Sequence, residues 1–237
     1  MSARTALSRP RATRRAQDWP RNEVLLLCVM AAVAVQGAVP TGDVQRIVVS
    51  LLLGTVLIGS FRMARATGWV RATADVVAVA GVCVAILRST GVLVGEGQAR
   101  LMNAAVAAIA PPAVALGVLR ELRENDRIGL GPVTGVITLY MLLGMMWAFV
   151  FGTIDEFGGA FFAQEVPATA SRCLYFSFVT LATVGYGDYT ARTDLGHTLS
   201  IFESLLGQIY LVTVVSLIVG NLGQIRPRRA MPGKEPQ

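Results

Sequence analysis

The residues best suited to chemistry are five consecutive positions, Thr183, Val184, Gly185, Tyr186 and Gly187. A dehydrated cation needs oxygen atoms in place of its water shell, and successive backbone carbonyls supply them if the backbone alternates between right- and left-handed conformations. Gly185 and Gly187 can adopt a positive φ without a side-chain clash. We therefore expect the carbonyl oxygens of residues 183–186 to bind cations, with the Thr183 hydroxyl as the lowest ligand. Val184 and Tyr186 then point away from the ions and pack behind them.

This segment supplies one wall of an ion site, because it occurs once in the chain. Four such walls are needed to surround an ion. A single copy therefore implies a closed fourfold ring of identical chains, so that the expected partners of each chain are three further copies of itself.

The segment directly before these residues, SRCLYFSFVTL, is an apolar helical run of about ten residues. A helix needs about 20 apolar residues to cross a bilayer. The run is therefore expected to enter the membrane and return. Irregular backbone at membrane depth is tolerated only where protein or a water-filled path surrounds it.

The elements around this segment are those of a membrane protein, because 54% of the 237 residues are hydrophobic and only 15% are charged. Six segments have the length and apolar character of membrane spans. We predict an all-α membrane protein with six transmembrane helices and a re-entrant helix between the fifth and the sixth. The predicted spans are residues 23–40, 44–62, 71–92, 100–119, 129–152 and 197–222.

The basic residues lie mostly in alternate loops, which argues against a nucleic-acid partner. Sixteen of the 21 Lys and Arg residues lie in the two tails and in the loops after the second and fourth spans, and five lie elsewhere. Basic loops stay in the cytoplasm. The distribution predicts a multi-pass protein of the cell membrane with both termini cytoplasmic. The first 40 residues also resemble a signal peptide, and their removal would leave the remaining topology unchanged.

Residues from about 130 to 222 resemble the pore module of the tetrameric potassium channels. The segment LYFSFVTLATVGYGD matches the pore helix and selectivity filter of that family. The six-span layout resembles its voltage-gated-like branch. The resemblance implies a homotetramer that conducts K⁺ passively through the bilayer, with K⁺ as the permeant ion and no cofactor. It also implies four regions: a basic tail (1–22), a four-helix peripheral domain (23–125), a pore domain (126–225) and a short tail (226–237).

The same resemblance assigns roles to residues near the filter. The pore helix is expected over residues 169–181, with its C-terminal end toward the central cavity, where the helix dipole favours a cation. Gly207 lies 19 residues after Asp188, where the family has a hinge glycine. Tyr175 and Phe176 match aromatic positions that brace the filter tyrosine, although packing in the core is an equal alternative. Thr180 is assigned to filter support.

Asp188 also has an expected partner. Some members of the family have a pore-helix glutamate that shares a proton with this aspartate, but Val179 stands there. Tyr175 aligns with an aromatic residue whose polar edge reaches the aspartate, and a phenol hydroxyl can donate such a bond. We predict that Tyr175 and Asp188 form a strut behind each filter wall.

The first 125 residues depart from the voltage-gated pattern in the fourth span. A voltage sensor needs several arginines inside the membrane field, but residues 101–119 contain no charged residue. Opening is therefore expected to depend only weakly on voltage. Pro111 and Pro112 are expected to kink this span.

Two acidic residues are predicted at membrane depth, where ionisable groups are usually functional. Asp75 in the third span has no arginines to pair with, which favours an interfacial or structural role. Glu203 lies one helical turn before Gly207. It either forms a hydrogen bond behind the filter or faces the cavity.

Three other functions compete with a conducting channel. A silent or regulatory subunit would have the same sequence features, although an intact filter argues against it. A coupled potassium transporter is disfavoured because such proteins usually carry several degenerate filter loops in one chain. An enzyme is not expected, because the chain has one histidine and no clustered carboxylates at a plausible site.

Overall fold

The structure is a computed structural model that describes residues 21–40, 42–63, 68–89, 96–124 and 130–222. Within these residues it contains seven helices and one isolated β-bridge, between Phe162 and Ala191. The helices are α1 (Arg21–Ala38), α2 (Asp43–Met63), α3 (Gly68–Ser89), α4 (Glu96–Glu124), α5 (Leu130–Gly158), α6 (Ala170–Leu181) and α7 (Asp194–Leu222).

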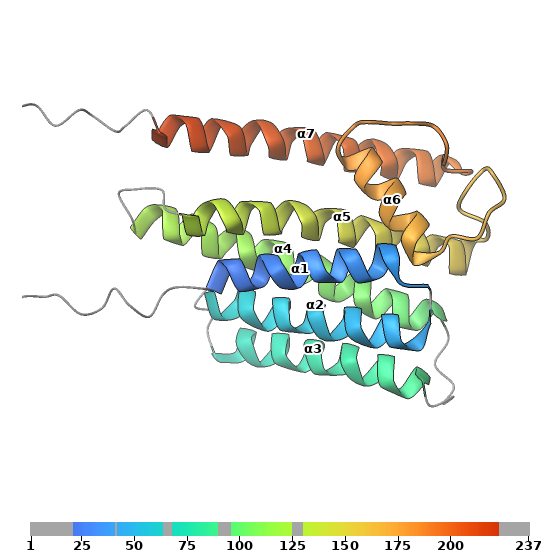
Figure 1. The fold of residues 1–237 in the computed structure, drawn as a ribbon, viewed down its shortest axis with the longest axis horizontal. Helices are drawn as coiled ribbons and strands as arrows, with labels where there is room; N and C mark the ends of the chain where they lie inside the picture. Colours follow the sequence, from blue (N-terminus) through green and yellow to red (C-terminus); the bar gives the residue numbers. More distant parts are fainter. Residues whose placement is uncertain (1–20, 41, 64–67, 90–95, 125–129, 223–237) are drawn as a thin grey trace, which may run out of the picture.

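Six of these helices are long and run along one common direction, whereas the short α6 crosses obliquely between α5 and α7 (Figure 1). Successive long helices alternate in direction. The start of α1 and the end of α7 therefore lie at one end of the bundle, and α6 lies near the other (Figure 1). This arrangement fits the prediction that both termini are on the same side.

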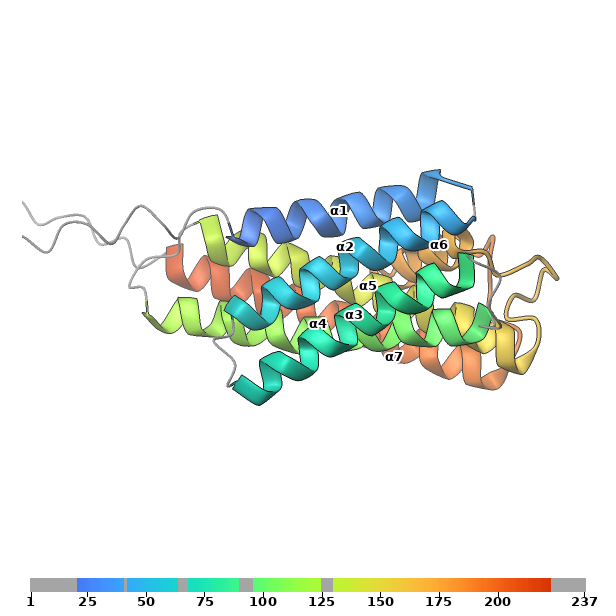
Figure 2. The same ribbon diagram turned by 90° about the horizontal axis from the view of Figure 1, so that it is seen from below.

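The first four helices form a layer beside the last three. α2 packs between α1 and α3 and also contacts α4, which in turn packs extensively against α5 (Figure 2). Most of the buried side chains of this layer are small or medium aliphatic residues. They include Leu25, Val29, Val49, Leu53, Val56, Leu57, Ala78, Val106, Ala107, Ala110 and Val114.

The core around α6 consists of aromatic residues. Four phenylalanine rings pack with their centroids 4.9–5.6 Å apart, mostly edge to face. They belong to Phe151 of α5, Phe161 and Phe162 of the following loop, and Phe176 of α6. Edge-to-face pairs of this spacing have a preferred geometry that aliphatic contacts lack. The aromatic cluster therefore fixes the orientation of α6 on α5.

Each of the six predicted spans corresponds to one long helix, but their ends differ. The largest difference is in α5, which was expected to end at residue 152 and continues to Gly158. Its last turns keep helical bonding, since the Thr153 hydroxyl donates to the Phe149 carbonyl at 2.8 Å. The apolar run marks where a helix is buried in a membrane, not where its backbone stops. The helix α4 continues through Pro111 and Pro112 without interruption.

Two stretches of the described helices are long and apolar enough to cross a membrane by composition alone, Asp43–Arg62 and Val133–Gly158. Shorter apolar stretches lie in α1, α3 and α4. These features support a membrane protein with helical spans. The two predicted tails lie almost entirely outside the described residues.

Candidate functional site: a carbonyl-lined segment after a short helix

The segment after α6 has the alternating backbone that the sequence predicts. Gly185 and Gly187 have φ values of 58° and 79°, and Thr183 has a φ of 55°, whereas Val184 and Tyr186 between them keep negative φ. The sequence identified the two glycines but not Thr183. A β-branched residue in the left-handed region is a conformational outlier that the surrounding structure must hold in place.

The C-terminal end of α6 binds the N–H groups of this segment. The Thr183 N–H donates to the Thr180 carbonyl at 2.9 Å, and the Val184 N–H donates to the Val179 carbonyl at 2.9 Å. The last carbonyls of a helix have no partner within the helix, so the segment satisfies them. These bonds occupy the N–H side of the segment, which leaves its carbonyl oxygens available for an ion. The assigned support role of Thr180 thus falls on its carbonyl.

The short helix begins and ends close to the predicted residues. Thr169 caps its N-terminus, with the side-chain oxygen accepting a bond from the Arg172 N–H, and Leu181 is its last residue. A threonine cap of this kind satisfies one of the free N–H groups of the first turn. Hydrogen bonds to α1 hold the same end, since the Ser171 hydroxyl donates to the Gly37 carbonyl at 3.1 Å.

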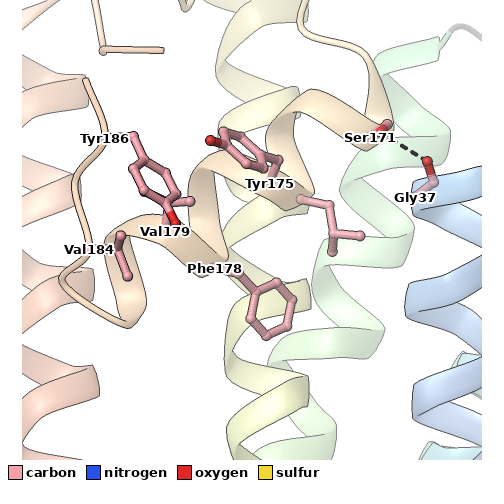
Figure 3. Close-up of a pocket in the computed structure, with 8 residues that line it drawn as sticks. Gly37, Ser171, Tyr175, Phe178, Val179, Val184 and Tyr186 are labelled. Atoms are coloured by element: carbon pink, nitrogen blue, oxygen red, sulfur yellow. Dashed lines mark hydrogen bonds between the residues drawn. The ribbon is translucent and has the colours of Figure 1, made fainter. Parts of the chain in front are cut away.

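A hollow of ≈ 410 Å³ lies behind the segment, between it and α6 (Figure 3). Val184 and Tyr186 line it from this segment, and Tyr175, Phe178 and Val179 line it from α6 (Figure 3). The rings of Tyr175 and Tyr186 lie nearly parallel, with centroids 6.5 Å apart. Tyr175 therefore lies where an aromatic brace for Tyr186 is expected.

Tyr175 also interacts with Asp188. The nearby Asp188 carboxylate raises the pKa of the Tyr175 hydroxyl to about 12. The carboxylate in addition accepts a bond from the Tyr189 N–H at 3.0 Å. The hydrogen bond of the strut and its effect on conduction both stay predictions.

Phe176 packs differently from Tyr175. Its ring contacts within the chain are with Phe151, Phe161 and Phe162 of the aromatic core, and it is buried. Adjacent residues of a helix point about 100° apart, so one of the pair faces the filter tyrosine and the other faces the core. Of the two expected roles for Phe176, packing in the core is the one that this geometry supports.

The chain on the outer side of the filter is held by the loop before α6. The Ala163 N–H donates to the Thr190 carbonyl at 2.9 Å, and the Arg192 N–H donates to the Phe161 carbonyl at 2.8 Å. The Gln164 side chain bonds both the hydroxyl and the N–H of Thr190. Phe161 and Phe162 of this loop are buried, so the loop is packed against the rest of the chain.

Gly207 lies where α7 passes the end of α6. A Cβ atom at this position would lie 2.1 Å from the Leu181 carbonyl oxygen, far inside any normal contact. The absence of a side chain therefore permits the two helices to touch. The helix α7 is continuous through Gly207, and the predicted hinge motion stays a prediction.

Glu203 is fully buried behind the filter and does not face a cavity in this chain. Its Oε1 lies 2.5 Å from the Ser177 Oγ of α6, and the same Oγ lies 2.7 Å from the Gly144 carbonyl of α5. The Ser177 hydroxyl has one proton and the Gly144 carbonyl can only accept, so both contacts are satisfied when a neutral Glu203 donates to Ser177. Its Oε2 has no hydrogen-bond partner among the described residues, which also favours the neutral acid.

Asp75, the other acidic residue predicted at membrane depth, is half-buried in α3. The helix α3 packs against α2 and α4 and not against α6 or α7. Asp75 is therefore not brought to the filter.

Two residues at this site were not found from the sequence. Ser177 of α6 and Gln208 of α7 are uncharged polar positions on helices that also carry many apolar residues, and both contact residues of another element. The signal that could have identified them is their polarity at membrane depth, which applies to uncharged side chains as well as to charged ones.

Residues 135–224 match a family whose model is described as an ion channel. This part of the chain is similar to potassium channels. It shares 34% identity over 88 residues with mouse (Mus musculus) "Potassium channel, subfamily K, member 16", a match that covers 33% of this chain and 30% of the mouse protein.

A second relative is "Probable potassium channel protein 2" of Methanocaldococcus jannaschii, with 44% identity over 45 residues, or 19% of this chain and 13% of that protein. The chain thus spans less than a third of the length of either relative. No solved structure gives a significant match.

Proposed function

We propose that the chain is a subunit of a potassium-selective channel in which residues 183–187 form the filter. The observation that carries the proposal is the positive φ at Thr183, Gly185 and Gly187, together with the hydrogen bonds from the N–H groups of residues 183–185 to the end of α6. Such a backbone presents several carbonyl oxygens of similar field strength in a row. These oxygens replace the hydration shell of K⁺ during passive conduction.

Four copies of the chain form the pore in this proposal. Among the described helices, α7 contacts α5 and α6 alone. It leaves a row of large apolar side chains exposed, which comprises Ile201, Phe202, Leu205, Leu206, Ile209 and Val212. Tyr186 of the filter is 71% exposed as well. We assign these surfaces to contacts with two neighbouring copies around a fourfold axis, because each copy then covers the exposed helix of the next.

The channel crosses the membrane six times and has both termini in the cytoplasm. Basic residues in alternate loops and tails support this orientation, as does the position of the first and last described residues at the same end of the bundle (Figure 1). The peripheral domain carries no row of arginines in α4, so we propose only weak voltage dependence.

Ion flux from liposomes that contain the purified full chain tests the proposal. We expect efflux of K⁺ and Rb⁺, little efflux of Na⁺, and block by Ba²⁺, which is close to K⁺ in size and carries twice its charge. Equal Na⁺ and K⁺ fluxes would contradict the assignment. The mass of the purified particle provides a second test, because a complex of four chains is expected.

A further inference from the structure

Gln208 is the one polar side chain of α7 that reaches the filter segment itself among the contacts of the described residues. Its Nε2 donates to the Thr183 Oγ1 at 2.8 Å. Both residues are exposed in the single chain. The Thr183 hydroxyl is the innermost oxygen of the proposed ion ladder, so this amide is bonded directly to a proposed ion ligand.

The packing of α7 on α6 brings Gln208 to this position. Gly207 removes the side chain that would collide with the Leu181 carbonyl. The Ser204 hydroxyl, one turn earlier on α7, lies 3.2 Å from the Thr180 carbonyl. Two successive turns of α7 therefore touch the last turn of α6, and the next side chain along α7, Gln208, meets Thr183, the second residue after α6.

Thr183 needs such a partner because its backbone is strained. It is a β-branched residue with a φ of 55°, and such residues rarely adopt this region. Its hydroxyl has one proton and two lone pairs. When the Gln208 amide donates to one lone pair, the rotation of the hydroxyl is restricted and the second lone pair is left for an ion.

We propose that Gln208 is a positioning residue for the innermost ion site of the filter. Its amide holds the Thr183 hydroxyl in the orientation that binds an ion. In the fourfold assembly, four Gln208 amides form a ring at the inner entrance of the filter. This inference rests on the proposed channel function.

Block by Ba²⁺ from the inner side tests the proposal, because an ion that enters from this side meets the Thr183 end of the filter first. In planar bilayers, Gln208→Met, which keeps the length of the side chain and removes the amide, is expected to raise the half-blocking Ba²⁺ concentration about five- to tenfold, the equivalent of one hydrogen bond. The preference for K⁺ over Na⁺ and the melting temperature should stay near those of the wild type, since the carbonyl ladder is unchanged.

The chain offers a matched control on the outer side of the filter. The Gln164 Nε2 donates to the Thr190 Oγ1 at 3.0 Å, which is the same pair of groups at a similar distance. Gln164→Met should change inner Ba²⁺ block less than twofold.

If Gln208→Met does not assemble, Gln208→Asn serves instead. Its side chain is one methylene shorter and cannot keep the bond to Thr183, so the same weakening of Ba²⁺ block is expected.

The outcomes separate this inference from the function on which it rests. A wild-type channel that selects K⁺, together with unchanged Ba²⁺ block in the Gln208 variant, would overturn the positioning role alone. If Gln208→Met lowers the melting temperature and the K⁺ selectivity together but does not weaken Ba²⁺ block, Gln208 has a structural role only. That result would also overturn the positioning role. Absence of potassium-selective current in the wild type would overturn both.

Discussion

The two halves of the molecule are held together in different ways. In α1–α4 the buried side chains are mostly Leu, Val and Ala, with a few polar contacts between helices, such as the bond from the Gln45 side chain to the Gln36 carbonyl. Around residues 183–187, ring contacts and hydrogen bonds join different elements of the chain. They come from the aromatic core, from the loop before α6, and from Glu203, Ser204 and Gln208 of α7. Aliphatic packing tolerates substitutions of similar volume, whereas directional contacts do not. We therefore expect the half that contains the filter to be far more sensitive to small changes.

The largest expected effect is the loss of selective conduction in Gly185→Ala or Gly187→Ala. Both positions have positive φ, where alanine costs about 1–2 kcal/mol in each chain of the proposed tetramer. Potassium and sodium efflux from liposomes measures the result. Gly68→Ala in the peripheral half, where nothing lies within 4 Å of the new methyl group, should conduct normally. Normal selectivity in both filter variants would show that the alternating backbone is not required.

The next effect concerns stability at the contact between α6 and α7. In Gly207→Ala the new methyl group would meet the Leu181 carbonyl, and overpacking of this kind typically costs about 1–3 kcal/mol. Thermal unfolding in detergent should therefore show a lower melting temperature. Gly54→Ala in α2 is the matched change, because its methyl group would lie at an ordinary 3.6 Å from Ala78. Equal decreases in melting temperature for Gly207→Ala and Gly54→Ala would show that the two halves of the molecule are equally sensitive to such changes.

Glu203 provides a test of the buried hydrogen-bond chain. Glu203→Gln retains a donor for Ser177 and should change the unfolding free energy by less than about 1 kcal/mol. Glu203→Ala removes the donor and leaves a cavity, and it should cost about 2–4 kcal/mol. Asp75→Asn serves as the peripheral control and should have little effect. If Glu203→Gln lowers the unfolding free energy as much as Glu203→Ala does, Glu203 is ionised and the neutral-acid assignment is wrong.

A smaller effect is expected from the strut between Tyr175 and Asp188. Tyr175→Phe removes only the hydroxyl, and Asp188→Asn removes the charge that the hydroxyl bonds. Each change should shorten open bursts severalfold in single-channel records. The double variant should lose little more, because the two groups act as a pair.

The pKa of Tyr175 gives the same pair a pH dependence. Because its pKa is raised from 10.0 to about 12, the hydroxyl keeps its proton when the pH passes 10, and the stabilisation is complete below pH 10. It is lost as the pH rises towards 12. Burst duration should therefore be constant up to about pH 10 in the wild type. Fully additive effects of Tyr175→Phe and Asp188→Asn on burst duration would refute the strut.

The smallest expected effect is that of voltage. The middle of α4, residues 101–119, contains no charged side chain, so little charge moves through the membrane field when the channel opens. Conductance–voltage curves in planar bilayers should be shallow. A gating charge of several elementary units per tetramer would show that the peripheral half is a voltage sensor after all.

The sequence alone determined the features that depend on local chemistry. The positive φ of Gly185 and Gly187, the short helix before them and six long helices were predictable, because backbone conformation and hydrophobic length are properties of neighbouring residues. The positive φ of Thr183 was missed, since a threonine carries no local signal for that conformation.

Only the tertiary structure decided which distant residues meet. The bond between Ser177 and Glu203 joins residues 26 positions apart, and that between Thr183 and Gln208 joins residues 25 apart. Whether Phe176 faces the filter or the core depends on how α6 is rotated against α5, and the role of Gly207 depends on where α7 crosses α6. Helical periodicity specifies which residues share a face, but the face that packs inward is set by the fit between whole helices.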